Sequence, residues 1–372
     1  MARDPEAGQA STACPTYPRR RLCPAERPTP SRSDERRRDT AGELPRLSRT
    51  PSNPKRLNPL QGVSLTIEHV LENLLTEQPN PVSASLDALP TEEALRIINA
   101  EDRRVALAVE REIPAIARAV DAIVAAFERG GRLFYIGAGT SGRLGVLDAS
   151  EIPPTFSAPP TMVQGIIAGG DAALSSATET TEDDPAIGVR DLLARGFTAG
   201  DVLVGIAASG RTPYVLGAAA EARRMGAVTV GISCTPDSEL ARAVDIAITP
   251  LVGPEAITGS PRMKAGTAQK MVLNMLSTGV FVRRGYVYGN LMVNVQPKNR
   301  KLLDRAARIV AQAAGVEYDR AVALVAAAGQ SPRVAIVMGK TGLDRGAAER
   351  RLAEAGGRVA VALERPLERR AG

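Results

Sequence analysis

The sequence predicts an α/β protein: a three-layer, doubly wound, five-stranded parallel sheet followed by a small C-terminal helical subdomain. Two observations carry this prediction. Between residues 131 and 297, five short apolar segments alternate with helix-like segments, and near-continuous apolar runs are typical of strands covered by helices on both faces. Strands separated by helices in this way favour parallel pairing. From about residue 299 onward, the pattern changes to Ala-rich helices.

The first 62 residues form a basic, proline-rich tail that we expect to be disordered. They contain 13 Lys and Arg against 7 Asp and Glu, and 10 of the 27 prolines. They show no apolar periodicity, so burial cannot offset the entropy of ordering them. We expect the tail to be dispensable, whether it is natural or results from a misassigned start site. A basic nucleic-acid arm is the alternative interpretation.

The remaining chain carries no net charge and no signal for a membrane or a metal. Its 34 basic and 34 acidic residues give no electrostatic case for binding nucleic acid. No apolar run reaches the about 18 residues of a membrane span. The single histidine, His69, precedes the core, and Cys234 is the one cysteine beyond the tail. We therefore expect a cytoplasmic protein without a histidine-based metal site.

Helices are expected to precede the sheet. Ile67–Leu75 looks like a short helix, and an irregular linker, Thr76–Ser83, follows it. Thr91, which is followed by two glutamates, predicts an N-cap and a helix to about Arg104. A further helix is predicted over Pro114–Arg129, because two glycines follow it and glycine commonly terminates helices.

The α/β domain is expected to place its ligand at the carboxyl ends of five strands. The predicted strands cover residues 132–137, 162–168, 201–207, 227–233 and 245–250. The predicted helices cover residues 142–149, 185–195, 212–225 and 263–284. C-terminal helices are predicted at 299–314, 317–328 and 346–355, and residues 334–337 fit either a strand or a buried helix. The expected domains are 1–62, 63–130, 131–297 and 298–372.

Two similar turns follow the first and third predicted strands. They read Gly-Ala-Gly-Thr-Ser-Gly-Arg from Gly137 and Ala-Ala-Ser-Gly-Arg-Thr-Pro from Ala207. Each leads into a predicted helix, whose free N–H groups and positive dipole end favour a phosphate. Small residues let the backbone approach such a ligand closely. The sequence therefore predicts two phosphate-facing turns, with a purely structural role as the alternative.

The first turn matches the better-known phosphate motifs only in part. It lacks the lysine of a Walker loop. Its residues match the Gly-x-Gly-x-x-Gly pattern of dinucleotide-binding turns. However, no acidic residue ends the next predicted strand, where a ligand for the ribose is expected. We therefore prefer a sugar phosphate to a dinucleotide as the ligand.

Two acidic clusters and one cation-bearing loop supply the candidate reactive groups. Asp148 and Glu151 lie just after the first turn, and Glu179 and Glu182 lie in the connection after the second predicted strand. A carboxyl in a partly dry pocket can exchange a proton near neutral pH; helix capping is the alternative role for each acid. The loop Gly253–Thr267 opens the most apolar helix. It predicts a further anion-facing helix end, with solvated capping as the alternative.

These motifs resemble the N-acetylmuramic acid 6-phosphate etherase family of the sugar isomerase (SIS) superfamily. The resemblance spans about residues 75–365 and is carried by Leu133–Pro154, Gly205–Tyr214, Met263–Lys270, Asn274–Gly279 and Gly289–Val293. It implies a SIS-type fold, a phosphosugar substrate, and a homodimer with sites near the interface. It also implies a role in amino-sugar catabolism, by recycling or scavenging, without metal or cofactor.

The activity implied by the resemblance is cleavage of the C3 D-lactyl ether of N-acetylmuramic acid 6-phosphate, by elimination and then water addition. Glu151 falls on the family's acid and Glu182 on its second glutamate, which acts as the C2 base; Glu179 is the weaker candidate for that role. The other matched positions bind substrate or line the site. They are Thr140, Ser141, Ser209 and Thr212 for the phosphate or hydroxyls, and Glu255, Arg262 and Lys264 for the lining.

Some features depart from the family, and two other functions stay open. The tail is foreign to the family, and Ile152 and Pro261 stand where a small polar residue is commoner. Neither residue removes a group that the chemistry needs. A non-catalytic phosphosugar regulator, as in the related glucokinase regulatory proteins, would not need both glutamates. A sugar-phosphate isomerase would share the fold and the ligand but would release no lactate.

Overall fold

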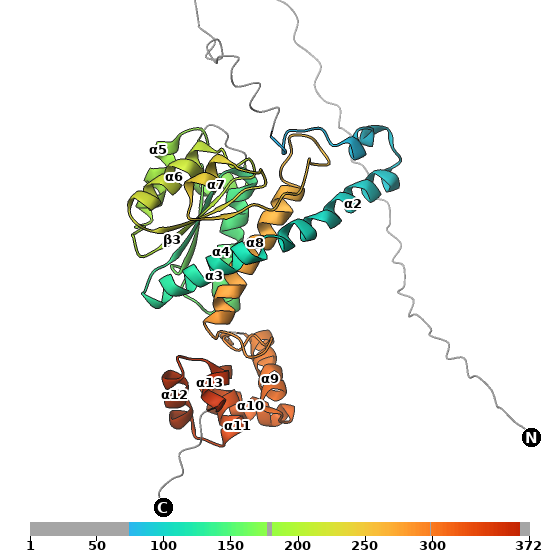
Figure 1. Ribbon diagram of the computed structural model, residues 1–372. Coiled ribbons are helices and arrows are strands. Elements are labelled where there is room, and N and C mark those ends of the chain that lie inside the picture. The colour runs from blue at the N-terminus through green and yellow to red at the C-terminus, as the bar shows by residue number, and fades with distance from the viewer. Residues whose placement is uncertain (1–73, 177–180, 298, 365–372) are drawn as a thin grey trace, which may run out of the picture. The chain divides into compact units, whose positions relative to one another are not determined.

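The computed structural model describes residues 74–176, 181–297 and 299–364 (Figure 1). The tail over residues 1–62, most of the predicted helix Ile67–Leu75, and Glu179 lie outside the described residues. The described part comprises an α/β domain with helices that precede it in the sequence, and a group of C-terminal helices.

The described chain contains a five-stranded parallel sheet in the order β2-β1-β3-β4-β5. The strands are β1 (Leu133–Gly137), β2 (Val163–Ile167), β3 (Val202–Ile206), β4 (Val228–Ile232) and β5 (Ile246–Ile248). Each lies within a segment predicted as a strand, so the predicted doubly wound sheet is confirmed. β1 lies between β2 and β3, so the strand order reverses there. Open parallel sheets bind ligands at such reversals, beyond the carboxyl ends of the strands.

Helices cover both faces of the sheet. One set consists of α3 (Ile113–Glu128), α4 (Gly139–Phe156) and α8 (Lys264–Arg283), and α2 (Thr91–Glu110) packs against α8. The other set consists of α5 (Pro185–Ala194), α6 (Pro213–Arg224) and α7 (Glu239–Ala243). Short 3₁₀ turns occur at Pro81–Ser83, Leu86–Ala88 and Gly170–Leu174. Figure 1 shows the sheet between the two sets.

Alternating side chains of β1 face two separate hydrophobic clusters. Leu133 and Tyr135 pack with the side chains of α3, α4 and α8. Phe134 and Ile136 point the other way and pack with the side chains of α5, α6 and α7. Both faces of the sheet are therefore buried at β1, which explains why the strand sequences are nearly continuous apolar runs.

The boundaries of α2 differ from the prediction. Its N-cap residue is Pro90, and no side chain caps the helix, so the predicted cap at Thr91 is wrong. The helix also continues to Glu110, because Val105 and Val109 extend its buried face by a further turn.

Helix α4 extends well beyond the predicted segment 142–149. It contains Pro153 and Pro154 and is followed by its C-cap residue Ser157, which has a left-handed backbone with φ of 55°. Proline normally ends a helix, and the prediction stopped short of this pair. Here the helix continues only to Phe156, so both prolines lie in its last turn.

The C-terminal helices have a hydrophobic cluster of their own. They are α9 (Arg300–Ala314), α10 (Tyr318–Ala327), α11 (Pro332–Thr341), α12 (Arg345–Glu354) and α13 (Val359–Glu364). The segment 334–337, which fitted either a strand or a buried helix, lies in α11 and is buried. Neither α7 nor α13 was predicted. The predicted helical C-terminal region is confirmed.

Among the described residues, no single helix is both long and apolar enough to cross a membrane. The pair α10 and α11 passes the same test of length and composition together, but its two helices meet at a bend of 115°. Both helices contribute buried side chains, including Leu324 and Ile336, to the C-terminal hydrophobic cluster.

The single cysteine in the described chain is predicted to be unreactive in the folded protein. Cys234 is 1% exposed, and burial, assisted by the Glu255 carboxylate, raises the pKa of its thiol to about 12. Because the thiolate is the reactive species, we expect no labelling of Cys234 by iodoacetamide at pH 8 in buffer and rapid labelling in urea. Mass spectrometry of the Cys234 peptide tests this. Equal labelling under both conditions would contradict it.

Candidate active site

The first and third strands bring the two predicted turns to one edge of the sheet. β1 and β3 pair in parallel, with Gly137 opposite Ile206. The turns that begin at Gly137 and Ala207 therefore leave the sheet next to each other. The candidate site is built on this edge.

The first turn opens α4 with unpaired backbone donors. Ala138 is the N-cap residue, and no side chain caps the helix. The Gly142 N–H donates to the Ala138 carbonyl, and the N–H groups of residues 139–141 have no acceptor within the described chain. Thr140 is half-buried beside them, and its methyl group lies next to Gly266 at the start of α8. This turn therefore leaves donors free, as a phosphate-binding turn requires.

Ser141 faces the interior, in contrast to Thr140. It is 8% exposed, and its hydroxyl donates to Gln269 Oε1 on α8 at 2.9 Å. Gln269 Nε2 is buried and has no hydrogen-bond partner among the described residues. Because buried donors are normally paired, this amide is a group that a ligand or a water molecule could satisfy where the first turn meets α8.

The second turn requires a glycine. Gly210 has a φ of 66°, a conformation that side chains disfavour. A Cβ at this position would also lie 2.3 Å from Ser238 Oγ. The turn is held further by the Arg211 N–H, which donates to Ser209 Oγ at 3.3 Å, and by an ion pair between Arg211 and Glu239 at 3.1 Å.

The helix after the second turn does not present the free N–H groups that the sequence predicts. α6 begins with Pro213, which has no N–H. The Tyr214 N–H donates to the Glu182 carbonyl at 3.0 Å. The expectation of a second phosphate-facing helix end is therefore wrong at these two positions. This bond instead fixes Glu182 beside the side chains of Ser209 and Thr212.

A cavity of about 290 Å³ lies against the second turn. The structure brings three of the predicted site residues, Glu182, Ser209 and Thr212, together around it. Thr181, next to Glu182, has a buried hydroxyl without a partner in the described chain. The full lining is Leu74, Glu77, Glu182, Asp183, Ser209, Arg211, Thr212 and Pro213. Carboxylates, hydroxyls and a guanidinium therefore converge on one small space.

The helix end of α8 faces an anion, but the anion belongs to the protein itself. The Glu255 carboxylate accepts from the Lys264 and Ala265 N–H groups, each at 2.9 Å. Glu255 is 1% exposed. This carboxylate satisfies two donors at the positive end of the helix dipole, so the predicted site residue Glu255 is a buried helix cap.

Lys264 is buried as well, and its ammonium group pairs with a carboxylate of α2. The distance from Lys264 Nζ to Glu101 Oε2 is 2.5 Å. Asn80 Nδ2 also donates to Glu101 Oε2, at 2.9 Å, and to the Pro254 carbonyl, at 3.2 Å. This network ties the start of α8, the middle of α2 and the linker before α2 together. Arg262, by contrast, is exposed.

Acid is predicted to weaken this network. Burial tends to raise the pKa of Glu101, but hydrogen bonds from Lys264, Asn80 and Arg104 outweigh it and hold the pKa below its ordinary value of 4.5. The ionised carboxylate therefore stabilises the fold above pH 4.5, and this contribution is lost as the pH falls through the folded pKa. We measure the free energy of unfolding in urea at each pH. We expect it to fall less steeply with acid in the double variant Lys264→Met with Glu101→Gln than in the unaltered chain. The same fall in unfolding free energy at acidic pH in both proteins would contradict the prediction.

The carboxyls of α4 differ sharply in their surroundings. Asp148 is 6% exposed and accepts from Asn274 Nδ2 at 2.8 Å, from the Tyr135 hydroxyl at 3.0 Å and from the Ser277 hydroxyl at 3.2 Å. Burial raises its pKa, and these hydrogen bonds offset the effect only in part. Glu151, almost one turn later, is exposed and does not line the 290 Å³ cavity.

Comparison with known proteins decides the family. Family models describe residues 115–223 as a glucokinase regulatory protein N-terminal SIS domain and residues 184–279 as a SIS domain. An N-acetylmuramic acid 6-phosphate etherase from Aeromonas hydrophila subsp. hydrophila is 56% identical over 287 residues, which is 77% of this chain and 96% of that protein. The chain belongs to the N-acetylmuramic acid 6-phosphate etherase family.

Other relatives agree with this assignment. The etherase from Serratia proteamaculans is 54% identical over 292 residues, covering 78% of this chain and 98% of that protein. Among solved structures, a phosphoheptose isomerase from Francisella tularensis has a TM-score of 0.40 at 19% identity, over 52% of this chain and 98% of that chain. The fold itself is established by the strand order of the sheet and by the SIS family match.

Sequence reasoning assigned no catalytic or binding role to several polar residues around the candidate site. Glu77 and Asp183 line the cavity, and Glu101 and Gln269 hold Lys264 and Ser141. Gln269 lies inside the motif Met263–Lys270, but the motif alone does not indicate what this side chain does. Glu77 and Glu101 carried no signal, because single acids in a linker and on an amphipathic helix normally face solvent.

Proposed function

We propose that this chain is an N-acetylmuramic acid 6-phosphate etherase. It cleaves the D-lactyl ether at C3 and yields N-acetylglucosamine 6-phosphate and D-lactate, a carbon–oxygen lyase reaction of amino-sugar catabolism. The observation that carries the proposal is the identity of 56% over 96% of an etherase of that name. The presence of both Glu151 and Glu182 favours catalysis over a regulatory role, which would need only the phosphosugar-binding turns.

The phosphate group is bound in this proposal by the two turns at the sheet edge. The free N–H groups at the start of α4 and the hydroxyl of Thr140 supply donors on one side. Ser209 and Thr212 supply hydroxyls on the other side, at the rim of the cavity. Ser141 contributes through Gln269, since its own hydroxyl is already engaged with that side chain.

The proposed chemistry needs one base and one acid. Ring opening of the sugar exposes an aldehyde, which acidifies the proton on C2. Glu182 removes this proton while Glu151 protonates the departing lactate oxygen, so the C3–O bond breaks and a C2–C3 double bond forms. Glu151 then assists water attack at C3, and C2 regains a proton. A carboxyl shielded from water by bound substrate can take either role near neutral pH.

The loop before α8 supports this site indirectly, because it holds the start of the helix in place. Glu255 and Lys264 are both 1% exposed, so we propose that they fix the start of α8 and do not touch substrate. Arg262 lies two residues before Lys264 and is exposed, so its guanidinium can contact the substrate. We therefore assign a binding role to Arg262 and positioning roles to Glu255 and Lys264.

We also propose that the chain acts as a homodimer. Glu151 and Glu182 do not line the same cavity within one chain, so a second copy is a simple way to complete the site. Exposed apolar side chains occur on α4 and on α8: Leu147, one turn before Glu151, is 53% exposed, and Met275, which follows the Asp148 partner Asn274, is 37% exposed. A homodimer would bury such side chains, since homodimer interfaces are more apolar than the rest of the protein surface.

The experiment that tests the function is a product assay with chelator present. The purified full chain is incubated with N-acetylmuramic acid 6-phosphate, and D-lactate and N-acetylglucosamine 6-phosphate are measured together. Equal release of the two products supports the etherase. Formation of a ketose phosphate without lactate would indicate an isomerase, and tight binding without turnover would indicate a regulator.

Removing the tail is predicted to leave the enzyme intact. The Aeromonas relative is matched over 96% of its length by 77% of this chain, and the family motifs in the sequence begin only near residue 75. We therefore expect deletion of residues 1–60 to change the turnover number and the melting temperature very little. Calorimetry and the lactate assay measure both. A large loss of either quantity would give the tail a structural role.

A further inference from the structure

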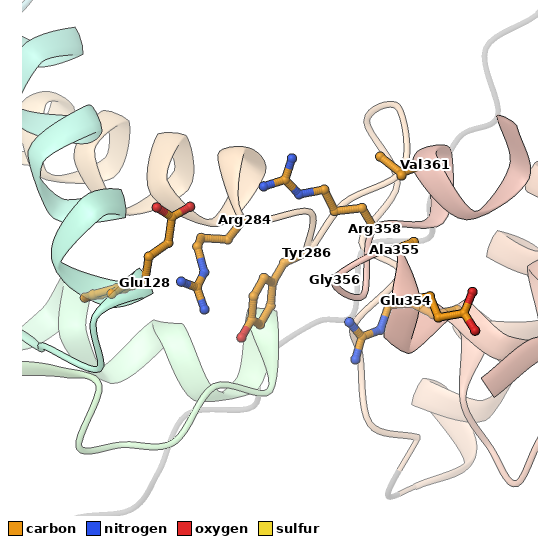
Figure 2. Close-up of a pocket in the computed structure, with 10 residues that line it drawn as sticks. Glu128, Arg284, Tyr286, Glu354, Ala355, Gly356, Arg358 and Val361 are labelled. Atoms are coloured by element: carbon orange, nitrogen blue, oxygen red, sulfur yellow. The ribbon is translucent and has the colours of Figure 1, made fainter. Parts of the chain in front are cut away.

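A second cavity lies between the end of α8 and the C-terminal helices and has a volume of about 510 Å³ (Figure 2). It is far from the candidate active site. α8 has 20 residues and is therefore about 30 Å long, with the first turn at its start and this cavity at its end. Nothing in the proposed etherase chemistry uses it.

Three arginines from three different elements line this cavity. Arg284 is the C-cap residue of α8, Arg333 is the second residue of α11, and Arg358 lies just before α13. No ion pair joins any of them to a carboxylate among the described residues, whereas Arg132, for example, pairs with Asp201 at 2.9 Å. The cavity therefore contains three guanidinium groups without a partner of opposite charge in this part of the chain.

The carboxylates that line the cavity are fewer than its arginines. Glu128 and Glu354 both line the cavity. Figure 2 shows the Glu354 carboxylate turned away from Arg284, and the Glu128 carboxylate and the Arg284 guanidinium pointing in different directions. The cavity therefore has three cations against two anions, a net excess of positive charge.

Arg333 is poorly satisfied by the protein alone. Its one hydrogen bond within the described chain runs from Nη1 to the Gly357 carbonyl, at a long 3.4 Å. A guanidinium has five N–H donors, and burial lowers the pKa of this one, an effect that Tyr286 opposes. A partly buried charge with unused donors is costly, so an anionic ligand would bring a clear gain.

We propose that this arginine pocket binds a small phosphorylated molecule, with its phosphoryl group held by Arg284, Arg333 and Arg358. Arginine forks match the oxygens of a phosphoryl group, and three forks suit a dianion with three terminal oxygens. The volume exceeds what a bare phosphate needs and lies in the range of small-molecule sites. The ring of Tyr286 and the side chain of Val361 provide an apolar wall for the organic part.

Phosphate-dependent stabilisation tests this proposal independently of catalysis. The melting temperature of the full chain is measured with increasing inorganic phosphate at constant ionic strength. The background is Ser209→Ala with Thr212→Ala, which weakens the active site. We expect the stabilisation to persist in that background, and we expect Arg333→Gln with Arg358→Gln to weaken phosphate binding at least about tenfold. Arg283→Gln, an exposed neighbour, is the matched control and is expected to change nothing.

Chemical footprinting gives a second measurement that needs no variant. Phenylglyoxal modifies accessible arginines, and the rate at each position is followed by mass spectrometry of the native protein. We expect phosphate to slow the modification of Arg284, Arg333 and Arg358 at least about fivefold while leaving Arg283 unchanged. Unchanged rates at all three positions, or full phosphate stabilisation in the Arg333→Gln, Arg358→Gln variant, would overturn the proposal.

Discussion

Glu182→Gln is expected to lower the turnover number at least about 10²-fold, the usual scale for loss of a general base. The substitution keeps the shape of the side chain. It also keeps the carbonyl that accepts from the Tyr214 N–H, so the chain stays in place at the second turn. Glu151→Gln is expected to have a loss of similar size, because an amide cannot protonate the lactate oxygen. The lactate assay under saturating substrate measures both.

Matched variants separate chemistry from structure in this test. Asp183→Asn removes a neighbouring charge that lines the same cavity, and Ser150→Ala changes an exposed neighbour of Glu151 on α4. Both are expected to retain most of the activity. Near-normal turnover in Glu182→Gln or in Glu151→Gln would remove that residue from the mechanism.

The second large effect is expected on stability. Lys264→Met removes the cation that pairs with Glu101 at 2.5 Å, where both side chains are at most 5% exposed. Breaking a buried pair from one side leaves the other charge uncompensated and typically costs about 3–5 kcal/mol. We expect a value near the lower limit, because Asn80 and Arg104 still donate to Glu101. Urea unfolding of the full chain measures the loss.

The double variant makes this prediction specific. Glu101→Gln in the Lys264→Met background removes the stranded charge, so we expect it to recover most of the lost free energy of unfolding. Lys270→Met, an exposed position on the same helix, is expected to change stability by less than about 0.5 kcal/mol. A loss below about 1 kcal/mol in Lys264→Met would mean that the pair does not hold α2 to α8 as described.

The sheet and the edge that carries the site could be predicted because their signals are local. Five apolar runs located the five strands of the described sheet, and parallel pairing then placed the turns at Gly137 and Ala207 at one edge. The backbone details were less predictable. A proline at position 213 signals the absence of an N–H, but nothing local shows that the Glu182 carbonyl takes the next one.

The roles of Glu255 and Lys264 could not be read from the sequence for a different reason. Both looked like groups lining a substrate site, and both are buried in contacts with partners elsewhere in the chain. Lys264 pairs with a residue 163 positions away, and such a contact leaves no trace in local spacing. Glu255 lies only nine residues before Lys264, but a charged loop fits a buried cap and an open site equally well.

The position of α8 in the chain has a consequence for folding during synthesis. This helix packs against α2, α3 and α4, and it begins at Lys264, whereas α3 ends at Glu128. At 5–20 residues per second, the ribosome needs about 7–27 s to make the intervening residues. The apolar surfaces of the N-terminal helices therefore stay open to chaperones for on the order of ten seconds, until translation delivers the helix that covers them.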